Sequence, residues 1–161
     1  MTGGASEPDF VLETEIGAPP DEVHAALCDL HRLSPLHPLI ESIDEIDPDP
    51  ALPGATRYRV VDRIPIGPLR MKTTYVAALE AVSDTEVHGH AWQSPGVRLR
   101  TIYALEACDR GARLVERCHV HAPRWLRRFV VSQARAAHAE MLRGLGAMLE
   151  HERANAPPPS R

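Results

Sequence analysis

The chain has 161 residues, 43% of them hydrophobic and 25% charged, which is the composition of one ordinary globular domain. Its formal net charge of −4 gives no general attraction to nucleic acid or to an anionic surface, so we expect no nucleic-acid partner. No apolar run is long enough to cross a bilayer, and we expect no integral membrane association.

The first part of the chain predicts a strand, two short helices and a second strand. Apolar and polar residues alternate over residues 9–16, as in a half-buried strand. Pro20 and Asp21 then favour the start of a helix, because proline suits the first turn and an acidic side chain suits its positive end. A second short helical turn is expected near Leu33, and the isoleucines among the acidic residues of 39–46 indicate a second strand.

Five further strands are predicted, because alternating stretches are separated by turn-forming residues. They cover residues 55–64, 69–82, 85–92, 97–107 and 112–121. Strands joined by such short turns are antiparallel neighbours.

From Pro123 the period changes to that of a helix of about seven turns. Its stripe consists of Leu126, Val130, Gln133, Ala137, Met141, Leu145 and Met148. Gly144 and Gly146 are poor helix formers, so either the helix frays late or it approaches the sheet closely there.

This order predicts an α+β fold in which a curved seven-stranded antiparallel sheet wraps around the long C-terminal helix and encloses a cavity. We expect one domain over residues 9–152, a disordered tail over 1–8 and a proline-rich tail over 153–161.

Three local motifs resemble the START-like, helix-grip superfamily (SRPBCC), which includes the polyketide cyclase/dehydrase proteins and the plant pathogenesis-related allergens. Ile-Gly-Ala-Pro-Pro-Asp-Glu-Val at 16–23 is similar to the family's I-x-A-P-x-x-x-V entry into the first helix. Cys-Asp-Leu at 28–30 stands where L-x-D follows, and 109–114 resembles the G-T-R-V turn with Ala112 in place of Thr. The family often has tryptophans where residues 33–38 stand, so a different pocket rim is expected.

The resemblance covers roughly residues 9–152 and implies the helix-grip fold with a cavity for a small, largely apolar molecule. It leaves the function open, because this fold hosts lipid carriers, hormone receptors, aromatase/cyclases, coenzyme Q-binding proteins and ring-hydroxylase subunits.

Two His-x-His pairs, His88 with His90 and His119 with His121, each place two imidazoles on one face of a strand, as a metal site would require. In the expected topology a third strand separates the pairs by about 9.6 Å. No carboxylate or cysteine obviously completes either set, so we expect no metal, and we expect no cofactor.

The strand over 85–92 leaves its orientation open, because both of its faces are largely apolar. With Trp92 facing inward, His88 and His90 would enter the pocket as candidate catalytic groups and Trp92 would contact the ligand.

Glu116 is a third candidate catalytic residue, since it falls among inward-facing apolar neighbours. A buried carboxylate must be paired or neutralised, so the alternative is a pair with an arginine or a position near the rim of the sheet.

The candidate ligand-binding residues combine apolar surface with a few polar groups, as in pockets for organic ligands. They are Tyr75, Trp92, Tyr103, Trp125, Phe129 and Gln133. The aromatic residues among them could equally be packing residues.

Three scattered cysteines match neither a disulfide framework nor a zinc motif, and the first eight residues lack the apolar segment of a signal peptide. A cytoplasmic location is therefore expected.

The favoured hypothesis is a protein that binds a small hydrophobic molecule, such as a lipid, a polyketide or an isoprenoid. The alternative is an aromatase/cyclase or dehydratase that uses histidine, glutamate or tyrosine side chains for proton transfer. A third possibility is an interaction module with a filled pocket.

Overall fold

The computed structural model describes residues 6–159. Parts of both predicted tails, residues 1–5 and 160–161, lie outside the described residues. The elements in chain order are β1 (Phe10–Ile16), α1 (Pro20–Leu27), α2 (Leu30–Leu33), the 3₁₀ helix η1 (Ser34–Leu36), β2 (Ile40–Ile46), β3 (Ala55–Ile66), β4 (Leu69–Ser83), β5 (Glu86–Gln93), β6 (Val97–Cys108), β7 (Gly111–His121) and α3 (Arg124–Ala154).

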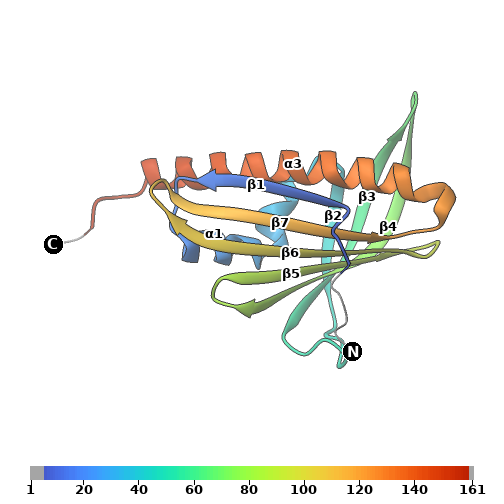
Figure 1. Ribbon diagram of the computed structural model, residues 1–161, viewed down its shortest axis with the longest axis horizontal. Helices are drawn as coiled ribbons and strands as arrows, with labels where there is room; N and C mark the ends of the chain where they lie inside the picture. The colour runs from blue at the N-terminus through green and yellow to red at the C-terminus, as the bar shows by residue number, and fades with distance from the viewer. Residues whose placement is uncertain (1–5, 160–161) are drawn as a thin grey trace.

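Across the described residues, seven antiparallel strands form one sheet in the order β1-β7-β6-β5-β4-β3-β2. β2 to β7 follow one another as neighbours, and β1 joins the free edge of β7. Figure 1 shows α3 running along this sheet beside β1, with the β3–β4 hairpin projecting beyond the helix. The predicted fold class is confirmed.

Two predicted boundaries were wrong. β3 and β4 pair up to Ile66 and Leu69, so the turn that we placed at residues 65–68 is only the Gly67-Pro68 connection, and Pro65 belongs to β3. Because Gly67 has a φ of 57°, it supplies the left-handed residue of this tight turn. α3 continues to Ala154, two residues into the predicted tail.

The main core lies between the C-terminal half of α3 and the strands it covers. Leu142, Leu145 and Leu149 of α3 are buried in one cluster with Ile16 of β1 and Leu114 of β7. Full burial of each such side chain contributes about 1.5–3 kcal/mol, so these leucines fix α3 on the sheet. Among residues 6–159, no helix combines the length and hydropathy that a bilayer span requires.

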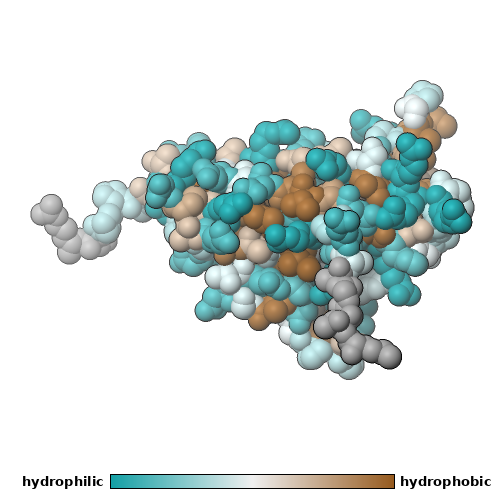
Figure 2. Space-filling view, viewed as in Figure 1, coloured by the Kyte–Doolittle hydropathy of each residue, from teal (hydrophilic) through white to brown (hydrophobic). Residues whose placement is uncertain are grey.

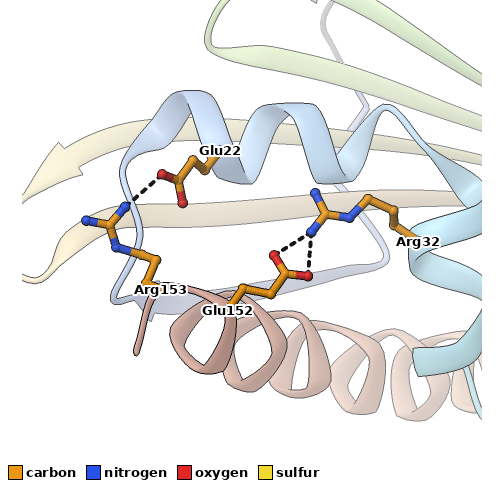
Figure 3. A network of polar contacts seen from close by, with 4 residues as sticks. All are labelled: Glu22, Arg32, Glu152 and Arg153. Carbon is orange, nitrogen blue, oxygen red and sulfur yellow. Dashed lines mark hydrogen bonds and ion pairs between the residues drawn. The ribbon is translucent and has the colours of Figure 1, made fainter. Parts of the chain in front are cut away.

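Ion pairs connect the C-terminal end of α3 to the two short helices (Figure 3). Arg32 lies 2.7 Å from Glu152, and Arg153 lies 2.7 Å from Glu22. All four side chains are at least one third exposed, so each pair contributes little to stability.

The two glycines of α3 lie in a regular helix, which excludes late fraying. A Cβ at Gly144 would lie 3.2 Å from Cδ2 of Leu36, whereas a Cβ at Gly146 would lie 3.7 Å from Ile16. The first distance is a crowded contact and the second is an ordinary one. Close approach therefore accounts for Gly144.

We predict opposite outcomes for the same substitution at these two positions. Gly146→Ala raises the free energy of unfolding by about 1 kcal/mol, because alanine is the better helix former and its methyl group fits against Ile16. Gly144→Ala raises the free energy of unfolding markedly less, or lowers it, because Leu36 must move. Urea denaturation of both variants measures the difference, and equal gains would contradict this account.

Candidate functional site

A cavity of about 120 Å³ lies between the N-terminal half of α3 and the inner face of the sheet. Its lining residues come from β3 to β6, from α3 and from the segment after η1. A hollow of about 80 Å³ adjoins it and shares His37, Tyr75, Leu99 and His138 as lining residues. Since a cavity of about 150 Å³ accommodates benzene, this space suits a group the size of one aromatic ring.

An apolar groove of about 650 Å³ adjoins this cavity. Phe129 and Val130 line both the cavity and the groove, while Met71 of β4 and Trp125 of α3 line the groove alone. Figure 2 shows that the visible face is largely hydrophilic, with hydrophobic patches that include the projecting β3–β4 hairpin. The cavity and the groove therefore share part of one wall, which α3 supplies.

A buried polar pair beside the cavity joins Glu116 of β7 to His138 of α3. Glu116 is completely buried, and one of its carboxylate oxygens contacts Nδ1 of His138. Burial by itself lowers the pKa of His138, but the charge and hydrogen bond of Glu116, with the charge of Asp62, outweigh it and raise that pKa. Because Nδ1 is engaged by Glu116, Nε2 is the ring nitrogen left for a ligand.

His37 is a second imidazole at the same place, in the opposite protonation state. Its ring centroid lies 5.9 Å from that of His138. Burial, and then the charge of His138, lower the pKa of His37 to about 3, so this ring is neutral at pH 7. Its Nδ1 lies 3.4 Å from the backbone nitrogen of Leu39 and accepts its hydrogen bond, which leaves an Nε2–H donor.

Asp62 of β3 and Tyr75 of β4 form a third polar group in the cavity wall. Burial raises the pKa of Asp62 to about 6, although a hydrogen bond to Tyr75 and the charge of His138 act in the opposite direction. Burial, followed by the charge of Asp62, raises the pKa of Tyr75. Within residues 6–159, Oδ1 of Asp62 and Oε2 of Glu116 have no hydrogen-bond partner. Asp62 is therefore a carboxyl group that titrates close to neutral pH beside a neutral phenol.

The candidate ligand-binding residues are distributed over these three spaces. Tyr75, Phe129 and Gln133 line the cavity, Tyr103 lines the adjoining hollow, and Trp125 lines the groove with 78% of its surface exposed.

The sequence left the facing of β5 open, and the register of the sheet resolves it. Gly89 pairs with Leu79 of β4 and shares the inner face with it, so His88, His90 and Trp92 lie on the outer face. A Cβ at Gly89 would make ordinary contacts of 3.6–3.7 Å with side chains of β4 and β6. The expectation that no carboxylate stands near these histidines was wrong, since Glu80 lies opposite His88 in the register.

Sequence reasoning missed three of the cavity's polar residues. His138 lies four residues after Ala134 and three before Met141, so the helical stripe could have included it. Asp62 continues the inward alternation of Tyr58 and Val60, which could also have been noticed. His37 lies in an irregular segment, where no periodicity predicts its direction.

No protein-family model matches the chain, and no curated protein matches it either. Solved structures resemble it over most of its length. The structure of TTHA0849 from Thermus thermophilus gives a TM-score of 0.68 at 21% identity, covering 91% of this chain and 99% of that one. The structure of the Zhui aromatase/cyclase from a Streptomyces species gives a TM-score of 0.66 at 14% identity, covering 91% of this chain and 95% of that one.

Ara h 8.0201 gives a TM-score of 0.67 at 19% identity, covering 88% of this chain and 97% of that one. These likenesses establish that the chain has the helix-grip fold.

We predict that Glu116 controls the titration of His138. In the wild-type protein the imidazole of His138 titrates above its ordinary pKa of 6.5, and in Glu116→Gln it titrates below 6.5, because burial is then opposed mainly by Asp62. NMR titration of the histidine side chains measures both values. A His138 pKa that stays above 6.5 in Glu116→Gln would contradict the pairing. His119, on the outer face of β7, serves as the internal control.

Proposed function

We propose that this protein binds a small, mostly apolar molecule, of the lipid, polyketide or isoprenoid type, in the cavity between α3 and the sheet. The observation that carries the proposal is an apolar cavity, beside an apolar groove, whose walls hold a few buried polar groups. Such a site favours a ligand with a large apolar body and one or two oxygen atoms.

The polar groups indicate how the ligand's oxygen atoms would be recognised. His37 offers an N–H donor, while the Asp62 carboxyl group has an oxygen without a protein partner. A ligand hydroxyl group placed between them would accept a hydrogen bond from His37 and donate one to Asp62, whose oxygen otherwise remains unpaired at a cost of about 1–3 kcal/mol. A fully saturated hydrocarbon would leave them unpaired, so an oxygenated ligand is favoured.

We predict that the purified protein carries a bound apolar compound, which native mass spectrometry detects and organic extraction identifies. Ala134→Leu reduces the bound fraction, because Ala134 lines the cavity and a larger side chain fills it. Ala136→Leu is the matched control, since Ala136 is exposed on the same helix. Equal occupancy in both variants would place the ligand elsewhere, and no binding across lipid and polyketide panels would favour an interaction module.

The second candidate function is acid–base catalysis on a bound carbonyl compound, as an aromatase/cyclase or dehydratase requires. The Glu116–His138 pair supports it, because the neutral form of His138, with its Nδ1–H donated to Glu116, could accept at Nε2 a proton from the carbon next to a carbonyl group. The electrons of the C–H bond would move to the carbonyl oxygen, which the Tyr75 hydroxyl or the protonated Asp62 would stabilise by hydrogen bonding. A solved structure of the same fold is an aromatase/cyclase.

We predict that the wild-type protein catalyses hydrogen–deuterium exchange at the central carbon of bound 1,3-diketones in D₂O. His138→Gln slows this exchange by about 10²-fold or more, because the base is lost, while native mass spectrometry still detects the bound diketone. His119→Gln, on the outer face of β7, leaves the rate unchanged. An exchange rate in His138→Gln equal to that of the wild-type protein would contradict the catalytic role of His138 and leave binding as the function.

A further inference from the structure

The outer face of β4 and β5 brings three metal-ligating side chains together, and of these only His90 borders the hollow that adjoins the cavity. Glu80 lies directly opposite His88 in the antiparallel register, and His90 follows two residues later on the same face. One ligand atom of each residue lies within 4.8 Å of those of the other two. This cluster follows from two regular geometries, a cross-strand pair and an i, i+2 pair.

A fourth residue, Glu86, holds the ring of His88. Nε2 of His88 lies 2.6 Å from a carboxylate oxygen of Glu86. A carboxylate that engages one ring nitrogen fixes the orientation of the ring and leaves the lone pair of the other nitrogen available. Histidines that bind metals are commonly supported in this way.

The ring of His90 is also held in place while one of its nitrogens lacks a partner. It stacks on Trp92 with a centroid distance of 5.6 Å and an interplanar angle of 9°. Its Nε2 is buried and makes no hydrogen bond within residues 6–159. The stacking fixes the orientation of the ring, and the unpartnered nitrogen is a position that a metal ion could occupy.

We propose that Glu80, His88 and His90 form a binding site for a divalent transition metal ion, with Zn²⁺ as the ion of best fit. Two imidazoles and one carboxylate are a known three-residue ligand set for zinc and leave a fourth position for water. Donors around tetrahedral zinc lie about 3.4 Å apart, so small side-chain rotations must close the cluster by about 1 Å. Arg100, opposite His90, opposes a cation, but Glu80 and Glu86 together exceed its charge.

The test titrates Zn²⁺ into chelator-treated protein in competition with a chromophoric chelator. We expect one Zn²⁺ per chain, with at least about tenfold weaker binding in Glu80→Gln and in His90→Asn. Glu86→Gln weakens binding by about tenfold or more, because the support of His88 is lost. The double variant His119→Asn/His121→Asn is the matched control, since it removes the other His-x-His pair and leaves this site intact.

Circular dichroism without metal verifies that each variant folds. The absence of stoichiometric binding to the wild-type protein, or equal weakening by the His119/His121 double variant, overturns the proposal. Neither result bears on the cavity, because none of the variants in this titration alters the Glu116–His138 pair.

Fluorescence gives a second readout, because the chain has two tryptophans and one of them stacks on a proposed ligand. We expect Co²⁺ bound at this site to quench the fluorescence of Trp92. Trp125→Phe should therefore retain the quenching, and Trp92→Phe should lose it. Retention of the quenching in Trp92→Phe places the metal elsewhere and overturns the proposal.

Discussion

The packing of α3 against the inner face of the sheet determines where this molecule is filled and where it is hollow. The C-terminal half of the helix presents Leu142, Leu145 and Leu149, which are buried in the main core. The preceding turns present Ala134 and Ala137 toward the strands, and the cavity lies there. Because the helix is rigid, short side chains cannot be compensated by bringing it closer to the sheet. The position of the cavity is therefore a consequence of side-chain size along one helix.

The buried polar groups of this hollow region constrain one another. Glu116 has no exposed surface, and an unpaired carboxylate there would be strongly destabilising. Its contact with His138 resolves this by placing a positive charge beside it, and burial together with that charge keeps His37 neutral. A buried ion pair of this kind contributes little net stability compared with well-packed apolar residues. Stability alone does not explain its presence, which supports a role in ligand recognition or proton transfer.

Much of this fold was predictable from the sequence, because alternation and helical period are strong local signals. The face of β5 was not predictable, since Val87, Gly89 and Ala91 are apolar and the opposite side carries Trp92, and only the pairing register with β4 and β6 decides between them. Glu116 was identified because alternation placed it among apolar neighbours, but its partner is a histidine on α3 rather than an arginine. Contacts between a strand and a distant helix depend on how the two elements pack, which periodicity alone does not encode.

The two proposed sites occupy opposite faces of the same two strands. In β4, Tyr75 and Ala77 point toward the cavity and its adjoining hollow, while Glu80 points outward. In β5, Ala91 points inward and the two histidines point outward. A metal bound to Glu80 and His88 would connect β4 to β5 at a directly paired position and would resist sliding of one strand past the other. Since the same register sets the relative positions of Tyr75 and Ala91 in the cavity wall, an ion on the outer face would stabilise the geometry of the inner one without contacting its ligand.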